Sequence, residues 1–416
     1  MKEKNIQKSR VLGAILLVAG NCIGAGMLAL PVLTGPGGFT PAIIMFLLCW
    51  LFMTTTGLLL LEANLAIGEN VSIITMAEST LGRAGKWIIW VVWALLFYSL
   101  LVAYVAASGA LLASAIQAII HVQVPDFLGS LIFVLFFGFL VYLGTQAVDY
   151  FNRFLMIGLV ISYVCLISFG ALDVKYELLE RSEWSYTFFM LPILIISFGF
   201  HNIVPSLVPY LKGHARSLKW TLYAGSAIPL CIYLIWEWMV LGIVPVNGAN
   251  GLVEALEKGS SATDALKSIL GNSWIASMAE YFAVFALITS FLAVALSFVH
   301  FLADALKVKS QKRESKVLCA LVFVPPFIFA VISPHVFLTA LNYAGGVAVI
   351  LFGIMPALMT WVLRYHKKST HAILVPGGRF LLVIIILFAT GVFLLELSSE
   401  LGLLDTLKAW SLENVR

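Results

Sequence analysis

The stretch GNCIGAGM, Gly20–Met27, interrupts an apolar run that extends from Val11 to Thr34. A helix needs about 20 mostly apolar residues to cross the hydrocarbon core of a bilayer, and this run is long enough. Three glycines and an asparagine at its midpoint disfavour a continuous helix, because glycine is a poor helix former and asparagine competes for backbone hydrogen bonds. The stretch therefore predicts a membrane-crossing segment that is broken halfway.

The composition of the whole chain also indicates a membrane protein. Hydrophobic residues make up 61% of the 416 residues and charged residues 11%, whereas soluble domains are roughly 45–50% apolar. The lipid bilayer is thus an expected partner, and the small net charge of +4 does not point to nucleic acid. The five cysteines lie far apart inside apolar runs, which predicts neither a disulfide framework nor a metal site, and we expect no cofactor.

Eleven runs are long and apolar enough to cross the bilayer as helices. We expect an all-α integral membrane protein with a single membrane domain over residues 1–416. The basic segment before the first run is followed by no cleavage pattern, so that run is expected to remain as the first span. The predicted spans are 11–34, 39–61, 87–120, 127–148, 154–172, 184–211, 220–245, 274–303, 317–333, 335–363 and 380–403.

The basic residues predict the orientation of the chain. If the N-terminus is cytoplasmic, most of the 25 lysines and arginines lie in cytoplasmic segments, including the clusters at 2–10, 307–316 and 364–368. Cytoplasmic loops of membrane proteins carry such an excess. An odd number of spans then places the C-terminus outside.

A second break is predicted in SFGFHNIVPSLVP, residues 197–209, near the middle of the sixth span. Backbone that leaves a helix at this depth must be buried in protein or line a cavity. Five spans separate the breaks, so the two broken segments cross in opposite directions. This pattern predicts an inverted repeat of residues 11–172 and 184–363, with 380–403 as an additional span. An alternative explanation for glycines four residues apart, at Gly20 and Gly24, is that they let a neighbouring helix pack closely.

The two breaks predict a binding site between them. The half-helix that begins near Gly26 presents N–H groups and a positive dipole end, which suit a carboxylate. Carbonyl groups left free on the preceding half-helix suit an ammonium group or a small cation. A zwitterionic amino acid matches both ends, which favours a secondary transporter with its site near the middle of the membrane.

Other functional classes are less well supported by the sequence. No span carries a catalytic cluster such as HExxH, and the phosphate-binding motif GxxxxGK[ST] is absent, which disfavours a membrane enzyme and an ATP-driven pump. A channel remains an alternative, because broken helices also line pores. The sequence has no ring of charges or repeated filter to favour it.

Several segments resemble one known family. They are IGAGMLALP (23–31), LLLLEAN (58–64), SFGFHNIVPSLVPYL (197–211), LITSFLAVAL (287–296) and LNYAGG (341–346). Together they are similar to the bacterial hydroxy/aromatic amino acid permeases of the amino acid/polyamine/organocation superfamily. The resemblance implies a fold of five-plus-five inverted repeats and no enzymatic activity. It also implies proton symport of an aromatic amino acid across the inner membrane by alternating access, with tyrosine first and tryptophan or phenylalanine as alternatives.

The resemblance also implies which residues contact the substrate. In the third span Tyr98 and Tyr104 are candidates, but six residues rotate a helix by about 240° beyond one turn, so only one is expected to face the site. Tyr104 is nearer the middle of the span. Phe198, Phe200, Phe282 and Phe285 would suit an aromatic side chain. The contacts carried over from the family are Asn21, Gly24, Ala25, Gly26, Ser197, Phe198, Gly199, Phe200 and His201.

GNCIGAG is also similar to the first-span motif of the sodium-coupled neurotransmitter symporters. That similarity implies Na⁺ as an alternative to H⁺ as the coupling ion. Thr289 and Ser290 have another reading, in which their hydroxyls bond to their own helix or to a neighbour. The implied sodium ligands are Gly20, Ile23, Ala286, Thr289 and Ser290.

Ionisable residues inside spans are costly and hence candidates for function. His201 is the strongest candidate for proton coupling, because it adjoins the second break and histidine titrates near neutral pH. The alternative is a neutral histidine with an ordinary hydrogen-bond partner. Glu62 is a second candidate, for gating or proton binding, or else a cap for a neighbouring helix. Glu237 and Glu396 are expected in the interfacial belt.

Overall fold

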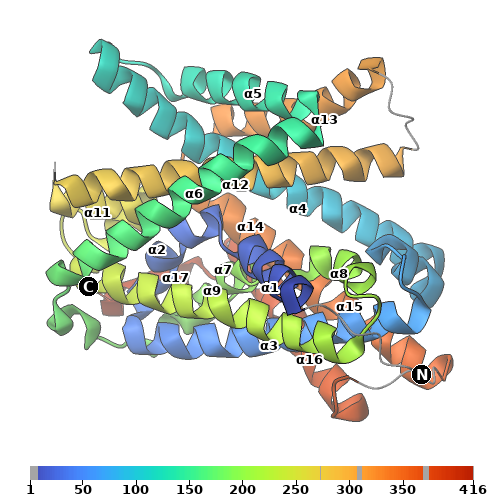
Figure 1. Ribbon diagram of the computed structural model, residues 1–416. Coiled ribbons are helices and arrows are strands. Elements are labelled where there is room, and N and C mark those ends of the chain that lie inside the picture. Colours follow the sequence, from blue (N-terminus) through green and yellow to red (C-terminus); the bar gives the residue numbers. More distant parts are fainter. Residues whose placement is uncertain (1–7, 272, 307–311, 369–373, 416) are drawn as a thin grey trace.

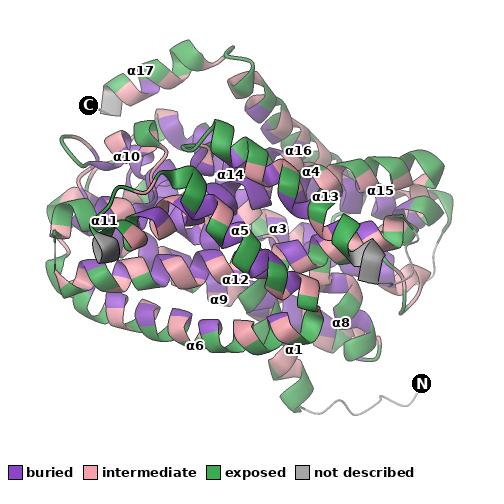
Figure 2. Ribbon diagram, turned by 90° about the horizontal axis from the view of Figure 1, so that it is seen from above, coloured by how far each residue is buried: buried purple, intermediate pink, exposed green. Residues whose placement is uncertain are grey.

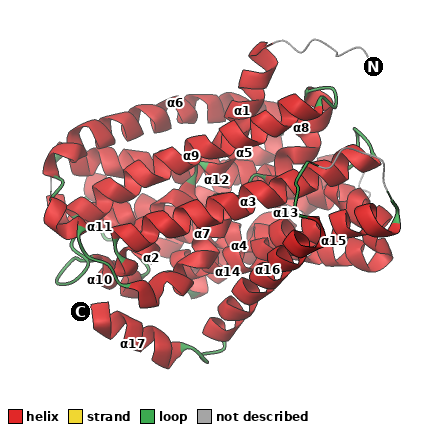
Figure 3. Ribbon diagram, turned by 90° about the horizontal axis from the view of Figure 1, so that it is seen from below, coloured by secondary structure: helices red, strands yellow, loops and turns green. Residues whose placement is uncertain are grey.

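The computed structural model describes residues 8–271, 273–306, 312–368 and 374–415 as an assembly of helices (Figure 1). Within these residues the chain forms no strand, and loops join the helices (Figure 3). The predicted all-α class is confirmed. The basic residues before Lys8 and several in the 307–316 cluster lie outside the described residues.

Most of the predicted spans are present as long apolar helices. Nine helices in the described chain are long and apolar enough to cross a membrane, and Lys316–Ile332 is a shorter apolar helix. These ten correspond to the second to eleventh predicted spans. The first span lies in short pieces, α1 (Lys8–Cys22), η1 (Ala25–Leu28) and α2 (Leu30–Thr34), because its helix is broken. The chain is a multi-pass membrane protein.

The remaining helices follow the predicted order. At Gly82, where φ is 71°, α4 turns from a short helix into the long membrane-spanning part; this positive φ suits glycine. The elements are η2 (Gly35–Gly37), α3 (Phe39–Ile67), α4 (Ile73–Ile120), α5 (Asp126–Leu143), α6 (Thr145–Gly170), η3 (Ala171–Asp173), η4 (Tyr176–Leu179), η5 (Trp184–Met190), α7 (Leu191–Ser197), η6 (His201–Ile203), α8 (Val204–Tyr210), α9 (Ala215–Ile243), α10 (Leu252–Lys258), α11 (Ala262–Leu270), α12 (Trp274–Ala305), α13 (Lys312–Ile332), α14 (Phe337–Val349), η7 (Ile350–Ile354), α15 (Met355–Trp361), η8 (Val362–His366), α16 (Gly378–Glu400) and α17 (Asp405–Val415).

The broken segments lie inside the assembly. Helix α1 packs on α9, whereas α7 packs on α14 and α3. Buried residues gather in the middle of the molecule, and the outer sides of α6 and α16 are exposed (Figure 2). Large apolar side chains such as Phe154 of α6 and Phe380 of α16 are exposed there, as expected of a surface that faces lipid.

The first and last described helices lie toward different ends of the assembly. Figures 1 and 3 both place α17 at one end of the long helices, whereas α1 begins nearer to the other end. An odd number of crossings gives this arrangement. The site described next lies between these two ends.

Candidate functional site

The first break follows α1, which ends at Cys22. Gly24 has extended backbone, and the N–H of Ala25 donates a hydrogen bond to the Ser290 hydroxyl at 2.8 Å. A Cβ on residue 24 would lie 2.4 Å from Ser290 Oγ. Glycine is therefore needed at this position because α12 approaches the backbone too closely for a side chain.

The second break follows α7, which ends at Ser197. The chain then turns through Gly199 and a single turn at His201–Ile203 before α8 begins. A Cβ at Gly199 would lie 2.9 Å from the carbonyl oxygen of Ile196. The glycine permits the tight turn that ends α7 and places the two breaks side by side.

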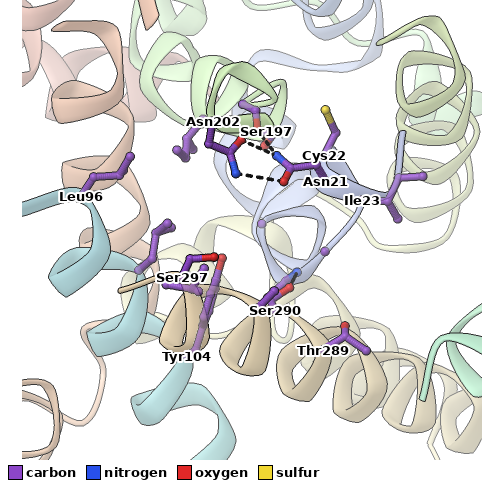
Figure 4. Close-up of a pocket in the computed structure, with 18 of the residues that line it drawn as sticks. Asn21, Cys22, Ile23, Leu96, Tyr104, Ser197, Asn202, Thr289, Ser290 and Ser297 are labelled. Atoms are coloured by element: carbon purple, nitrogen blue, oxygen red, sulfur yellow. Dashed lines mark hydrogen bonds between the residues drawn. The ribbon is translucent and has the colours of Figure 1, made fainter. Parts of the chain in front are cut away.

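A pair of amide side chains joins the two breaks. Asn21 Nδ2 donates to the carbonyl of Gly199 at 2.6 Å and to Asn202 Oδ1 at 2.9 Å, and Asn202 Nδ2 donates back to Asn21 Oδ1 at 3.1 Å (Figure 4). Asn21 was predicted as a substrate contact. Asn202 was not, although it lies in the same quoted motif.

Two side chains of helix α9 form hydrogen bonds with the backbone at the breaks. The Tyr233 hydroxyl lies 2.6 Å from the carbonyl oxygen of Cys22 and 2.9 Å from that of Ser197, the last residues of α1 and α7. Trp236 Nε1 donates to the carbonyl of Met27 at 2.9 Å. Both side chains are fully buried. Carbonyl groups released by the breaks are thus bound by α9, as buried backbone groups require.

A cavity of about 190 Å³ lies between the breaks. No Asp, Glu, Lys, Arg or His is among the described residues that line it, so a charged ligand would meet backbone groups, hydroxyls and amides. Most of the predicted substrate contacts lie in this lining, as do most of the predicted sodium ligands. They are Asn21, Gly24, Ala25, Gly26, Tyr104, Ser197 and Gly199, and Gly20, Ile23, Thr289 and Ser290.

Three predicted contacts lie one layer behind the cavity. Phe198, Phe200 and His201 are fully buried and do not line it. The His201 ring stacks on Phe352, which does line the cavity, at 4.7 Å between centroids, and its Nε2 lies 3.0 Å from Thr56 Oγ1. The turn after Ser197 directs these side chains toward α3, α9 and η7 instead of into the cavity.

The aromatic residues that line the cavity are not the phenylalanines that the sequence suggested. Trp93, Phe97 and Phe352 line the cavity, whereas Phe282 and Phe285 do not. Trp93 and Phe97 lie on α4, where only the two tyrosines were candidates, and Phe352 lies in η7. Aromatic residues are frequent throughout the chain, and only packing shows which ones face inward. Polar lining residues that the sequence did not indicate are Asn152, Asn202 and Ser297.

The two candidate tyrosines of α4 have different surroundings. Tyr104 lines the cavity and interacts with the Ser290 side chain. Tyr98 does not line it, and its hydroxyl donates to the carbonyl of Leu321 at 2.9 Å. Only one of the two faces the cavity, as helix rotation predicts.

The candidate sodium ligands already have protein partners. Thr289 Oγ1 donates to the carbonyls of Phe285 and Ala286 on its own helix, at 2.8 and 3.1 Å. Ser290 Oγ accepts from Ala25. Ala286 is fully buried and does not line the cavity. Thr289 therefore bonds to its own helix and Ser290 to a neighbouring segment. This is the alternative interpretation of these two residues, in which their hydroxyls bond to protein.

Glu62 lies in the last part of α3 and does not line the cavity. Its carboxylate accepts two bonds from Arg364, from Nε at 2.6 Å and from Nη2 at 2.7 Å, and a third from the N–H of Leu374 at 2.9 Å. The Glu62 side chain is 7% exposed and that of Arg364 8%. The geometry is that of a buried bidentate ion pair, which ties α3 to η8.

Exposed residues of the cavity wall lie toward one end of the molecule. Ala293 and Ser297 lie in the C-terminal half of α12 and are exposed, and Asn152 lies in the N-terminal half of α6. On the opposite side of the breaks Met27 and Trp236 are buried. The opening therefore faces the end of the molecule where α1 begins.

Comparison with known proteins agrees with this architecture. The tryptophan/tyrosine permease family matches residues 7–396. The chain is 30% identical over 382 residues to "Tyrosine-specific transport system 1" of Haemophilus influenzae, covering 91% of this chain and 94% of the relative. It is 31% identical over 409 residues to a "Tryptophan-specific transport protein" of the same organism, covering 95% and 98%.

A distant solved structure shares the fold. The crystal structure of a mutant manganese transporter from Eremococcus coleocola matches with a TM-score of 0.61 at 14% identity, covering 100% of this chain and 97% of the other. At this identity the likeness concerns the fold alone. The family match and the relatives indicate a transport protein rather than an enzyme, and the chain belongs to the tryptophan/tyrosine permease family.

Proposed function

We propose that this protein imports aromatic amino acids, tyrosine first and tryptophan or phenylalanine next, across the bacterial inner membrane by proton symport. The family and the names of the two relatives support the substrate class. One structural observation carries the proposal: a cavity without charged side chains among its described lining residues lies between two broken helices and is lined by both polar backbone and aromatic rings.

The cavity suits each part of such a substrate. The backbone at Gly24 and Gly26 would bind the carboxylate at the beginning of a half-helix. Carbonyl groups at the end of α1, near Gly20, would accept from the ammonium group. Trp93 and Phe97 offer rings to an aromatic side chain. These roles require no charged side chain in the membrane, where one would be costly.

We infer eleven crossings with a cytoplasmic N-terminus. Ten apolar helices and one broken segment support the count, and the positions of α1 and α17 toward different ends of the assembly support an odd number. With this orientation the cavity is open to the cytoplasm and closed to the outside. Transport then requires a second state, open to the outside, as alternating access supposes.

The proposed inverted repeat is supported by matching helix pairs. The first broken segment packs on α9 and the second on α3, which are the seventh and second spans. Likewise α4 packs on α14 and α12 packs on α6, which pairs span three with span ten and span eight with span five. In each case one pair maps onto the other when five is added to the number of the span in the first repeat and subtracted from the number of the span in the second.

The coupling ion is proposed to be H⁺, with His201 as a candidate. Its ring touches Phe352 in the cavity wall, and within the described residues its Nδ1 has no hydrogen-bond partner. The Na⁺ alternative rests on Thr289 and Ser290, whose hydroxyls line the cavity but are bonded to protein. Gradient-driven uptake separates the two ions.

The test is uptake of labelled tyrosine into proteoliposomes with either a proton gradient or a sodium gradient at constant pH. We expect accumulation with the proton gradient, competition by tryptophan and phenylalanine, and none by leucine. His201→Ala should lower proton-driven uptake, and Ser290→Ala should create no sodium dependence. Accumulation driven by sodium would instead assign Thr289 and Ser290 as ion ligands. Accumulation under neither gradient would refute the substrate assignment.

A further inference from the structure

Glu237 is a carboxyl group that the site does not use. It lies on α9, one residue after Trp236, and is 0% exposed. The sequence suggested the interfacial belt for Glu237. The structure instead buries it inside the protein, against the end of α2, because α9 directs it inward together with Tyr233 and Trp236.

The hydrogen bonds around Glu237 favour one form of the carboxyl. Glu237 Oε1 contacts the Thr34 hydroxyl, and the same hydroxyl lies 2.7 Å from the carbonyl oxygen of Leu30. A threonine hydroxyl has one hydrogen and a carbonyl has none. An ionised Glu237 would leave the Leu30 carbonyl and the carboxylate sharing the single hydrogen of Thr34, whereas a protonated Glu237 that donates to Thr34 Oγ1 would give each contact its own hydrogen. The contacts therefore favour the protonated acid.

The surroundings of Glu237 lead to the same conclusion. Within the described residues Glu237 Oε2 has no hydrogen-bond partner, and no Lys or Arg forms an ion pair with Glu237. A buried, unpaired carboxylate is strongly unfavourable, and the neutral acid is much less so.

Other charged groups on α9 and the elements packed against it form no ion pair with Glu237 within the described residues. On α10, which packs on α2, Lys258 pairs with Glu254. Lys175, before η4, is exposed, and the Nη1 and Nη2 atoms of Arg181, between η4 and η5, make no hydrogen bond in the described chain. Tyr233 is bonded to the carbonyls at the two breaks, and Tyr163 of α6 donates to the carbonyl of Ile232 at 3.0 Å. In the adjacent loop elements, Asp264 caps its own helix and Lys267 pairs with Glu280. The exposed acidic residues of η3 and η4 are Asp173 and Glu177, and the charged residues on α1, α3 and α6 at the other end include Lys8, Arg10, Glu62, Asp149 and Arg153.

Helix α2, which carries Thr34, is the outer half of the first broken segment in the proposed orientation. If the outside is to open, α2 must separate from α9, and water then reaches Glu237. A solvated carboxyl ionises at neutral pH. We propose that Glu237 is a proton-binding gate residue: it holds a proton while α2 closes the outer side and releases it when that side opens. The inference rests on the proposed alternating access and orientation, but not on the identity of the substrate.

The sign of the pH effect follows by linkage. The closed outer side holds one more proton at Glu237 than the open outer side, so a rise in pH favours opening. Replacing the carboxyl by an amide removes this dependence. Gln keeps a donor for the Thr34 hydroxyl and cannot ionise, so Glu237→Gln should close the outer side equally well at every pH.

The test measures opening without any substrate. Leu30 is fully buried beside this contact. We would introduce Leu30→Cys into a chain whose five native cysteines are alanine, and measure labelling by a membrane-impermeant maleimide from the outside. Equal pH on both sides excludes a gradient. Dividing the rate for the native carboxyl by the rate for Glu237→Gln cancels the pH dependence of the thiol itself. We expect this ratio to rise at least about threefold from about pH 6 to about pH 8, because a solvated glutamate is ionised in this range.

Two further variants complete the design. Glu396→Gln replaces another carboxyl of low exposure, 7%, which lies on α16, whereas the Thr34 hydroxyl bonds to Leu30 and Glu237. This variant should behave as the native chain. Thr34→Ala removes the partner of Glu237 and should speed labelling at low pH even if Glu237→Gln does not fold. A flat ratio, an equal change in Glu396→Gln, or no effect of Thr34→Ala would overturn the proposal. Because no substrate is present, these results are independent of whether tyrosine is transported.

Discussion

At Gly24 the absence of one side chain lets α12 approach the first break. The Ser290 hydroxyl occupies the space that a Cβ would fill and receives the N–H of Ala25. At Gly26, two residues further, a Cβ would meet Ser197 Oγ at an ordinary 3.7 Å. Two glycines of one motif therefore differ in what they permit.

Gly24→Ala should lower uptake by roughly tenfold, because the new methyl group displaces the Ser290 hydroxyl and costs a buried hydrogen bond, about 1–3 kcal/mol. Gly26→Ala is the matched control and should retain most of the activity. The double variant Gly24→Ala with Ser290→Ala removes the clash and should recover part of the loss. Initial rates of tyrosine uptake at equal protein density measure all three. Equal losses at positions 24 and 26 would contradict this account.

At the residue scale the sequence predicted backbone roles better than side-chain directions. Gly24 and Gly26 mark a break whatever their neighbours do, because glycine acts through the backbone. Phe198 and His201 lie in the right motif, yet a turn of non-helical backbone determines where they point, and no periodicity describes such a turn. Glu237 was misplaced for a similar reason: two flanking tryptophans suggest an interface, but only the packing of α9 shows that it faces inward.

A buried ion pair joins α3 and η8. Glu62 lies in the last part of α3 and pairs with Arg364 of η8, and it also accepts the N–H of Leu374 in the segment before α16. Three parts of the chain thus meet at one carboxylate. The pair is buried, unlike the exposed pair of Asp149 and Arg153 within α6.

Glu62→Gln should destabilise the protein by about 3–5 kcal/mol, because it leaves the Arg364 guanidinium buried without its partner. Asp149→Asn, in the exposed pair, should cost about 1 kcal/mol or less. Denaturant-induced unfolding in mixed micelles measures both changes. If the two variants are equally stable, the Glu62 pair does not hold these elements together.

Most elements could be predicted from the sequence, because length and hydropathy suffice to locate a membrane-spanning helix. The first span could be predicted as broken, and it forms α1, η1 and α2. The contact between α3 and η8 could not, because residues 62 and 364 are far apart in the chain and nothing local to either one indicates the other.

The molecule as a whole is asymmetric about its cavity. Exposed residues such as Ala293 line the open side, whereas Leu30 is buried on the other. In the proposed orientation this is a state open to the cytoplasm.

Ala293→Cys, in a chain without native cysteines, should react with an impermeant maleimide in inverted membrane vesicles, because the proposed orientation places this side of the cavity toward the cytoplasm. Excess tyrosine should slow this reaction by filling the cavity. Leu30→Cys should not react in the same vesicles. Faster labelling at position 30 than at position 293 would reverse the assigned side of the opening.

The Tyr233 hydroxyl lies between the carbonyls of Cys22 and Ser197 but has a single hydrogen to donate. It can therefore donate this hydrogen to the carbonyl at the end of either broken helix. If either half-helix swings away, the hydroxyl turns to the half that stays, and the number of bonds is unchanged. Rotation of the Tyr233 hydroxyl would therefore let either half-helix move without the loss of this hydrogen bond during transport.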